Sequence, residues 1–270
     1  MPDVTGHRVV SYPDEQHQAV DWSDIMRRQH TIHGLLEFDV TETRGAIHRW
    51  RRASHRPLSF TAVLVASFAH AIGEDTSLQA YRKGKRRVVL FDDVDVAVLV
   101  EQVIGGERVP VPHIVRAANR KTSADVDGEI RAAQGAADPY GRARRFAPLW
   151  LLLPAAVRRF ALTRLLADPW RRKRFTGTAA VTAVGMFGKG TGWGIPLISH
   201  SICLTGGGVA RKPGLARDGR IEPRDILCLT ISVDHDVVNG APVARFISRL
   251  RDSIESADLL VEPAAAQPDL

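Results

Sequence analysis

Two cysteines, few aromatic residues and no long uninterrupted apolar run set the first limits on this 270-residue chain. Cys203 and Cys228 lie among apolar neighbours and form no Cys-x-x-Cys pair, so we expect buried free thiols and neither a disulfide framework nor a zinc or other metal site. The longest apolar run, residues 146–157, is too short and too interrupted by proline to span a bilayer. Residues 1–20 have no apolar stretch behind a basic start, which argues against a signal peptide and favours a cytoplasmic location.

The bulk composition is that of an ordinary globular protein, with 44% hydrophobic and 25% charged residues. A chain of this length can bury a sizeable core, and a single α/β domain is the default expectation.

The formal net charge of +7 is concentrated in four basic clusters. These clusters are residues 82–87, 142–145, 158–159 and 171–174. Such clusters suit nucleic acid, an anionic membrane or a phosphorylated ligand such as coenzyme A, while a basic, arginine-rich proteome explains them equally well. No helix-turn-helix signature or aromatic-rich binding motif lies beside any cluster, so nucleic-acid binding is the weakest of these interpretations and we expect no nucleic-acid partner.

Periodicity and turn residues predict alternating strands and helices. We expect strands at 33–42, 86–102 (a strand pair or one bent strand), 108–119, 179–185, 200–208 and 225–233, and helices at 59–73, 121–137 and 241–254. The prolines of 108–119 place that strand at an edge or a bulge. The last helix is amphipathic, and Asn239 is placed to cap it.

Residues 138–174 are leucine-rich, arginine-rich and aromatic at once, which predicts an amphipathic helix or helix pair. The segment could cover a hydrophobic pocket, lie on a membrane surface or pack on the domain, and packing on the domain is the commonest outcome.

The glycine-rich residues 176–194 contain Gly188-Lys189, but Gly190 stands where a P-loop needs Ser or Thr, and Ala183 stands where it needs its first Gly. We therefore expect a short strand and a flexible loop rather than a nucleotide-phosphate loop.

His235 follows the strand at 225–233, in the phrase SVDHDVVNGA. A side chain there is held by a strand, a turn and a helix. Since unperturbed imidazole and thiol pKa values differ by about two units, transferring a thiol proton to a histidine costs only about 3 kcal/mol. An isolated histidine in such a place is more often structural, so the surrounding pattern has to decide.

The wider pattern resembles the catalytic domain of the 2-oxo acid dehydrogenase dihydrolipoamide acyltransferases, a family related to chloramphenicol acetyltransferase. Residues 229–255 resemble its terminal His-x-x-x-Asp-Gly block and following helix, with His235, Asn239 and Gly240 at the motif positions and Asn in place of the commoner Asp. Residues 178–188 resemble its T-x-x-T-I-S-x-L-G-M-F-G block, which places Thr182 at the hydroxyl position. Weaker matches at 33–41, 93–101 and 109–122 occur in the same order.

This resemblance implies an α/β fold, a two-layer sandwich of a mixed sheet with packed helices like that of chloramphenicol acetyltransferase. It implies an acyltransferase that uses acyl-CoA, with His235 as general base, Thr182 as hydrogen-bond donor to the oxyanion and Asn239 orienting the loop. Ser232 or Asp234 would support the loop, and arginines such as those of residues 171–174 would hold the coenzyme A phosphates.

The family also implies a homotrimer or a larger assembly of trimers, in which Thr182 and His235 face each other across a subunit boundary. We expect residues 1–24 to be an N-terminal segment, 25–258 the catalytic domain with 138–174 as an apolar and basic insertion, and 259–270 a flexible tail. No lipoyl domain is recognisable, so we expect a stand-alone catalytic unit that meets a lipoyl or other thiol carrier in trans. A non-catalytic oligomeric scaffold that keeps the fold is the alternative, and retention of both His235 and Thr182 argues against it.

Overall fold

The computed structural model of the chain describes residues 8, 12, 14–27, 29–104, 106–136, 149–183, 190–216 and 218–260. The main helices are α1 (Asp14–Met26), α2 (Thr41–Ser54), α3 (Phe60–Gly73), α4 (Ser123–Gly135), α6 (Ala155–Leu166), α7 (Pro169–Thr176) and α8 (Gly240–Ser256). Two short 3-10 helices are η1 (Thr76–Gln79) and η2 (Ala118–Arg120). The strands are β1 (Thr31–Asp39), β2 (Tyr81–Lys83), β3 (Arg87–Val89), β4 (Val96–Ile104), β5 (Glu107–Val115), β6 (Ala179–Ala183), β7 (Ile202–Leu215) and β8 (Ile221–Asp234).

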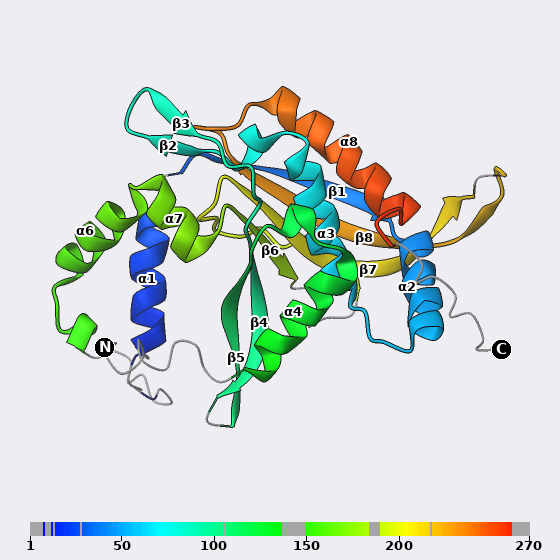
Figure 1. Cartoon of the computed structure of the whole chain (residues 1–270), viewed down its shortest axis with the longest axis horizontal. Coiled ribbons are helices and arrows are strands. Elements are labelled where there is room, and N and C mark those ends of the chain that lie inside the picture. Colours follow the sequence, from blue (N-terminus) through cyan, green and yellow to red (C-terminus); the bar gives the residue numbers. More distant parts are fainter. Residues whose placement is uncertain are drawn as a thin grey trace, which may run out of the picture.

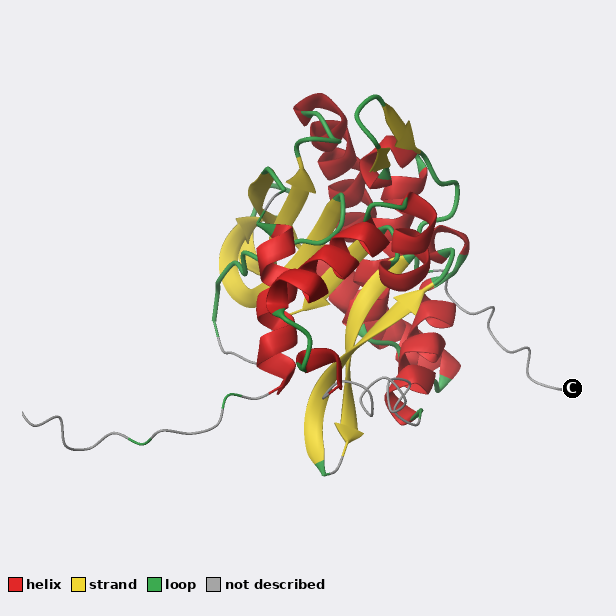
Figure 2. Cartoon of the chain, turned by 90° about the vertical axis from the view of Figure 1, so that its left-hand side faces the viewer, coloured by secondary structure: helices red, strands yellow, loops and turns green. Residues whose placement is uncertain are grey.

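Six strands form one mixed sheet in the order β1-β8-β7-β6-β4-β5. The short β6 pairs in parallel with both β4 and β7, and the other neighbours are antiparallel. Helices α3, α4 and α8 pack on one face of this sheet, and most of the helices gather on one side of the strands (Figures 1 and 2). The expected α/β fold, a mixed sheet with packed helices, is confirmed.

The core lies between this sheet and the helices. In α3 ten of the fourteen residues are buried, which explains its apolar character on nearly every face, and Ser59 caps it by accepting a hydrogen bond from the Ala62 N–H. Alternate residues of β8 point into the core, including Leu229 and Ile231. From α8, the buried side chains are Val243, Phe246, Leu250 and Ile254.

The prolines of β5 occupy the outermost strand of the sheet, as expected, since a residue without an N–H cannot serve a central ladder. The expected strand pair or bent strand at 86–102 is instead two strands in different sheets. β3 pairs with β2 in a separate hairpin, and only β4 joins the main sheet. Asp92 and Asp93 lie in the segment between them, which turns the chain from one sheet to the other.

Helices α6 and α7 confirm that the 138–174 segment is helical where it is described, and its apolar side chains are half-buried in part and exposed in part. Arg158 is the one buried side chain of α6, and its Nε donates to Asp21 of α1 at 2.6 Å. The large apolar side chains of the segment that stay exposed are Leu149, Leu152, Leu153, Val157, Phe160 and Trp170. Burial of the paired guanidinium thus positions α6, while part of its apolar surface stays exposed. None of the described helices has the length and apolarity needed to cross a bilayer.

The sheet face opposite the helices is crossed by residues 190–199 at a run of glycines. The Gly208 N–H donates to the Gly192 carbonyl at 3.1 Å, and the Trp193 indole donates to the Leu36 carbonyl at 2.9 Å. A Cβ at Gly207 would lie 2.1 Å from the Gly192 oxygen, so a side chain there is incompatible with the crossing.

The expected limits of the catalytic domain, at residues 25 and 258, remain a prediction. The limit between residues 24 and 25 lies inside α1, and Leu260 packs against the small cluster of Ile47 and Trp50, while residues 261–270 lie outside the described part.

Candidate active site

His235 lies in the turn between β8 and α8. The chain reverses because the backbone N–H groups of Val237 and Val238 both donate to the Asp234 carbonyl, at 3.1 and 3.0 Å. The Asp234 carboxylate also accepts the Asp236 N–H at 3.1 Å, which supports the turn from within. The His235 N–H donates to the His30 carbonyl at 2.8 Å and fixes the turn to the residue before β1.

Among the described residues, the imidazole of His235 has a hydrogen-bond partner on one nitrogen only. Its Nδ1 lies 2.9 Å from the Val238 carbonyl oxygen, and because a carbonyl can only accept, Nδ1 carries the proton of the neutral ring. Nε2 therefore has a lone pair, and the residue is exposed. A neutral imidazole held in this tautomer is equipped to accept a proton at Nε2.

Two carboxylates flank this histidine in different environments. Burial raises the pKa of the Asp234 carboxyl above its ordinary value. The Asp236 carboxylate is more accessible and lies 2.9 Å from His30 Nδ1 and 3.6 Å from Arg82 Nη1. Asp236 therefore links the turn to the β2–β3 hairpin.

Asn239 occupies the N-cap position of α8, as expected. Its side chain makes no capping hydrogen bond, so the expected side-chain cap is not formed. The residue is exposed. Its amide is therefore available to a substrate or to another subunit. Of the two residues expected to support the loop, Asp234 does so, whereas the Ser232 Oγ lies 2.8 Å from His33 Nδ1 on the neighbouring strand.

Thr182 lies on the central strand β6 and points away from the helices. Its neighbour Val181 is in the core, and adjacent strand residues face opposite sides. Thr205 and Thr230 stand beside it in register, so three threonine side chains form a row across β6, β7 and β8. The hydroxyls of Thr205 and Thr230 are buried and unpaired within the described part of the chain, whereas Thr182 is partly exposed.

Thr182 and His235 do not meet within one chain. Thr230 is level with Thr182 two strands away, and His235 lies five residues beyond Thr230. With about 3.3 Å per residue and about 4.8 Å per strand, their backbones are roughly 19 Å apart.

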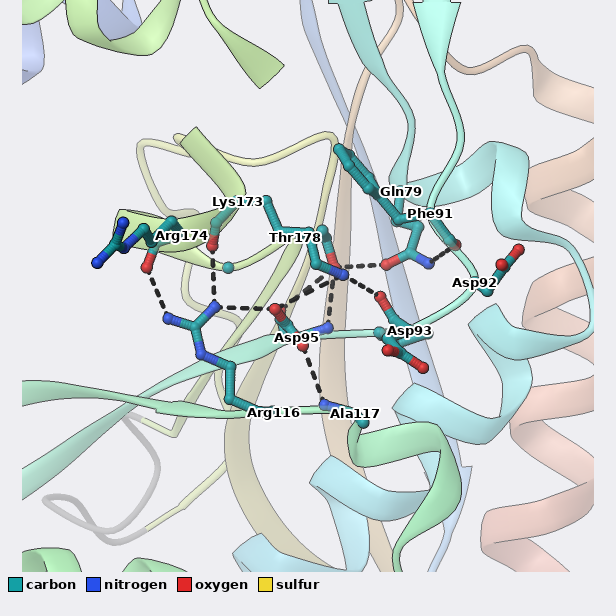
Figure 3. A network of polar contacts seen from close by, with 12 residues as sticks. Gln79, Phe91, Asp92, Asp93, Asp95, Arg116, Ala117, Lys173, Arg174 and Thr178 are labelled. Carbon is teal, nitrogen blue, oxygen red and sulfur yellow. Dashed lines mark hydrogen bonds and ion pairs between the residues drawn. The ribbon is translucent and has the colours of Figure 1, made fainter. Parts of the chain in front are cut away.

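The segment that leads into Thr182 is anchored by buried Asp95 at the start of β4 (Figure 3). The Asp95 carbonyl accepts the Thr178 N–H at 2.7 Å, and its carboxylate accepts Arg116 Nη1 at 2.8 Å and the Ala117 N–H at 2.9 Å. Arg116 also donates to the carbonyls of the last turn of α7, at 3.0 and 2.6 Å. The network therefore joins α7, β4, β5 and the entry to β6.

Two of the four basic residues at 171–174 have structural roles. Arg172 stacks on the buried ring of Tyr81 at 4.0 Å and donates to the Ser199 carbonyl. Lys173 donates to the Asp93 carbonyl at 2.7 Å. Only Arg171 and Arg174 keep exposed side chains, so this cluster has less charge to offer an anionic ligand than its sequence suggests.

Sequence reasoning missed two features of the site. The hydrogen bond from His235 to the Val238 carbonyl could not be predicted from the sequence, because every residue has a main-chain carbonyl. The contact of Asp236 with Arg82 joins positions 154 residues apart, and nothing local signals it. Among the described residues, no group of three or more His, Cys, Asp or Glu is arranged to hold a metal ion.

Comparison with known proteins gives this geometry a context. Residues 171–262 match the family model described as 2-oxoacid dehydrogenases acyltransferase (catalytic domain). The acetyltransferase component of the pyruvate dehydrogenase complex of Mycoplasma pneumoniae is 28% identical over 200 residues, which are 73% of this chain and 42% of that protein. The chain spans between 18% and 44% of the length of the curated relatives it matches.

Solved structures extend the likeness to the whole fold. The cubic core of a pyruvate dehydrogenase multienzyme complex and the dihydrolipoamide acetyltransferase of Azotobacter vinelandii each superpose with a TM-score of 0.66 at 16% identity, covering 96% of this chain and 98% of theirs. The Azotobacter structure belongs to an investigation of one serine, one histidine and one asparagine in the catalytic mechanism, and that asparagine follows that histidine by four positions. The resemblance expected from the sequence is therefore confirmed: residues 171–262 match the 2-oxoacid dehydrogenase acyltransferase catalytic domain, and the chain has the fold of dihydrolipoamide acetyltransferase cores.

Proposed function

We propose that this chain is an acyltransferase that moves an acyl group between coenzyme A and a thiol acceptor, with His235 as the general base. The observation that carries the proposal is the hydrogen bond from His235 Nδ1 to the Val238 carbonyl, which leaves Nε2 free to take a proton. Asn239 follows His235 by four positions, the spacing of the histidine and asparagine investigated in the Azotobacter enzyme.

In the proposed reaction, the acceptor thiol gives its proton to His235 Nε2, and the thiolate attacks the carbonyl carbon of the acyl-CoA. The tetrahedral intermediate carries its negative charge on oxygen, and the Thr182 hydroxyl donates a hydrogen bond to it. Collapse of the intermediate breaks the bond to the coenzyme A sulfur, which takes the proton back from Nε2. A preorganised donor of this kind accelerates acyl transfer by about 100-fold to 1,000-fold.

The separation of Thr182 and His235 supports a further part of the proposal, that the active site forms between subunits of a homotrimer or a larger assembly of trimers. The cubic core with the same fold is itself an assembly. The acceptor would then be a lipoyl group or another thiol carried by a separate protein. Relatives named for branched-chain and for pyruvate complexes both match this chain, so we assign no particular acyl group.

Thioester exchange measured by mass spectrometry tests the activity. The protein is incubated with a panel of acyl-CoAs and with dihydrolipoamide, and His235→Ala is compared with His48→Ala, which changes an exposed histidine of α2. We expect His235→Ala to lower the rate by about 100-fold to 10,000-fold and His48→Ala to leave it unchanged. An undiminished rate in His235→Ala would remove the proposed base, and a wild-type protein that transfers no acyl group while forming large oligomers would favour a scaffold.

Complementation tests the shared site. His235→Ala and Thr182→Ala subunits are each expected to be inactive alone. Co-expressed in a cyclic oligomer with random mixing, they would leave about one site in four with both wild-type residues. Recovered activity would support an intersubunit site, while no recovery in demonstrably mixed oligomers would place both residues' roles within one subunit or outside catalysis.

A further inference from the structure

The β2–β3 hairpin presents a dense basic surface beside the His235 turn. Residues 82–87 read Arg-Lys-Gly-Lys-Arg-Arg, and β2 pairs with β3 so that Arg82 faces Val88 and Lys83 faces Arg87. Gly84 turns the chain with a φ of 66°. The five cations in these six residues repel one another, which raises the electrostatic free energy of the hairpin. A bound anion would lower it.

Most of this charge is uncompensated by the protein. Lys85, Arg86 and Arg87 are exposed and make no ion pair within the described part of the chain. Arg82 is the exception, because its Nη1 lies 3.6 Å from Asp236 Oδ2. Cationic side chains that have no internal partner can bind an external anion without first breaking a contact.

The base of the hairpin is fixed rather than loose. Tyr81, the first residue of β2, is buried, and its hydroxyl donates to the Gly177 carbonyl at 2.8 Å while Arg172 stacks on its ring. Lys83 Nζ lies 4.1 Å from the centre of the Trp170 ring. Helix α7 therefore supports the hairpin from one side, and Figure 1 shows the hairpin and α7 adjacent in space.

The hairpin is also tied to the site. Arg82 contacts the residue that follows His235, so the basic turn begins next to the proposed base and extends away from it. β2 ends one residue after Arg82, and the turn that follows carries Lys85 and Arg86. This arrangement matches a ligand that places its reactive sulfur at His235 and its negatively charged phosphates, at the far end of a flexible arm, on the basic hairpin.

We propose that the β2–β3 hairpin binds the phosphate groups of coenzyme A, with Lys85 and Arg86 as the principal contacts and Arg82 nearest the thioester. This assignment rests on the proposed acyl transfer at His235. The hairpin would be the surface that binds the substrate for that reaction. It replaces residues 171–174 as the phosphate site, since Arg172 and Lys173 already serve the fold.

The decisive comparison uses one acyl group on two carriers, coenzyme A and pantetheine, because pantetheine lacks the phosphates. In the double variant Lys85→Ala/Arg86→Ala we expect KM for the acyl-CoA to rise by about 10-fold to 100-fold, and KM for the acyl-pantetheine and kcat for both to stay unchanged. The control Arg52→Ala/Arg56→Ala removes the same charge from exposed residues at and just after the end of α2, and it should change neither KM. An unchanged KM for the acyl-CoA, or equal rises for both carriers, would overturn the proposal.

Calorimetric titration with adenosine 3′,5′-bisphosphate tests the surface without turnover, and so separately from the proposed activity. We expect the wild-type protein and the α2 control to bind it, and Lys85→Ala/Arg86→Ala to bind it at least about 10-fold more weakly. Equal binding by all three proteins would overturn the assignment. Binding of phosphatidylglycerol vesicles that depends on the hairpin, without binding of the nucleotide, would assign the hairpin to lipid headgroups and refute it.

Discussion

Arg158 of α6 and Asp21 of α1 form a buried ion pair, with Nε donating to Oδ2 at 2.6 Å and side-chain exposures of 9% and 2%. Arg159 approaches the other oxygen of Asp21 at 3.0 Å. Although burial alone would raise the pKa of Asp21, its hydrogen bonds to these two arginines and their charges hold that pKa below its ordinary value. The pair connects the N-terminal helix to the 138–174 segment, which offers little apolar packing of its own.

Removal of Asp21 should therefore be costly. Asp21→Ala leaves the Arg158 guanidinium buried without its carboxylate, and we expect a loss of about 3 kcal/mol in the free energy of unfolding. Urea denaturation measures this loss, and Asp24→Ala is the matched control because Asp24 pairs with Arg159 where both are partly exposed. Loss from the control should be below about 1 kcal/mol. Equal losses in the free energy of unfolding for the two variants would show that burial does not determine the contribution of the Asp21–Arg158 pair to stability.

Acid should weaken the fold through His200. Burial lowers the pKa of His200 to about 4, and the nearby positive charge of Arg172 acts in the same direction. The unfolded chain takes up a proton at this histidine near pH 6.5 and the folded chain does not, so stability is lost as the pH falls from about 6.5 to about 4, by up to about 3 kcal/mol.

The measurement is the free energy of unfolding in urea at pH 7.5 and at pH 4.5, for the wild-type protein and for His200→Gln. We expect His200→Gln to be less stable than wild type at pH 7.5 and to lose less on acidification. The same acid-induced loss in both proteins would assign the pH dependence to other groups.

Two glycine substitutions should change the stability of the fold in opposite directions. Gly207→Ala places a Cβ against the Gly192 carbonyl and should cost about 1–3 kcal/mol or more by displacing residues 190–199 from the sheet. Gly128→Ala lies in the middle of α4 with open space around its Cβ, and it should stabilise the fold by about 0.5–1 kcal/mol. Thermal melting of the two variants compares them directly, and a neutral Gly207→Ala would contradict the close crossing.

Both cysteines should be unreactive in the folded protein. Cys203 and Cys228 are buried free thiols, as expected from their neighbours, and burial raises the pKa of Cys203 to about 12. A thiol reagent at pH 8 should label neither residue in the native state and both in urea. Rapid labelling of one thiol under native conditions would show that the strands open locally.

The sequence predicted those elements whose signal is local. The helices expected at 59–73 and 121–137 and the edge strand with two prolines each depend on neighbouring residues, and each is observed. The separation of β3 from β4 was missed, because an apolar strand looks the same whichever sheet it joins. β3 pairs with β2, which lies just before it in the chain, whereas β4 pairs with β6, which lies much later.

The same limit applies to the site. His235 and Asn239 could be selected because the motif around them is contiguous, but the hydrogen bond that sets the imidazole tautomer comes from a main-chain carbonyl. The amphipathic pattern expected within residues 138–174 gave no indication that Arg158 would be the buried residue of α6. A buried acidic partner, Asp21, draws an arginine inward, and its position more than a hundred residues earlier leaves no local trace.

The way Arg116 holds α7 bears on how this protein can diverge. The guanidinium donates hydrogen bonds to the main-chain carbonyls of Lys173 and Arg174 and to the Asp95 carboxylate. None of these contacts involves a side chain of α7. Homologues can thus exchange the exposed side chains of Arg171 and Arg174 while the entry to β6 stays in place. A homologue in which Arg116 or Asp95 is replaced should show a compensating change in the other, and drift at positions 171 and 174 alone should carry no structural penalty.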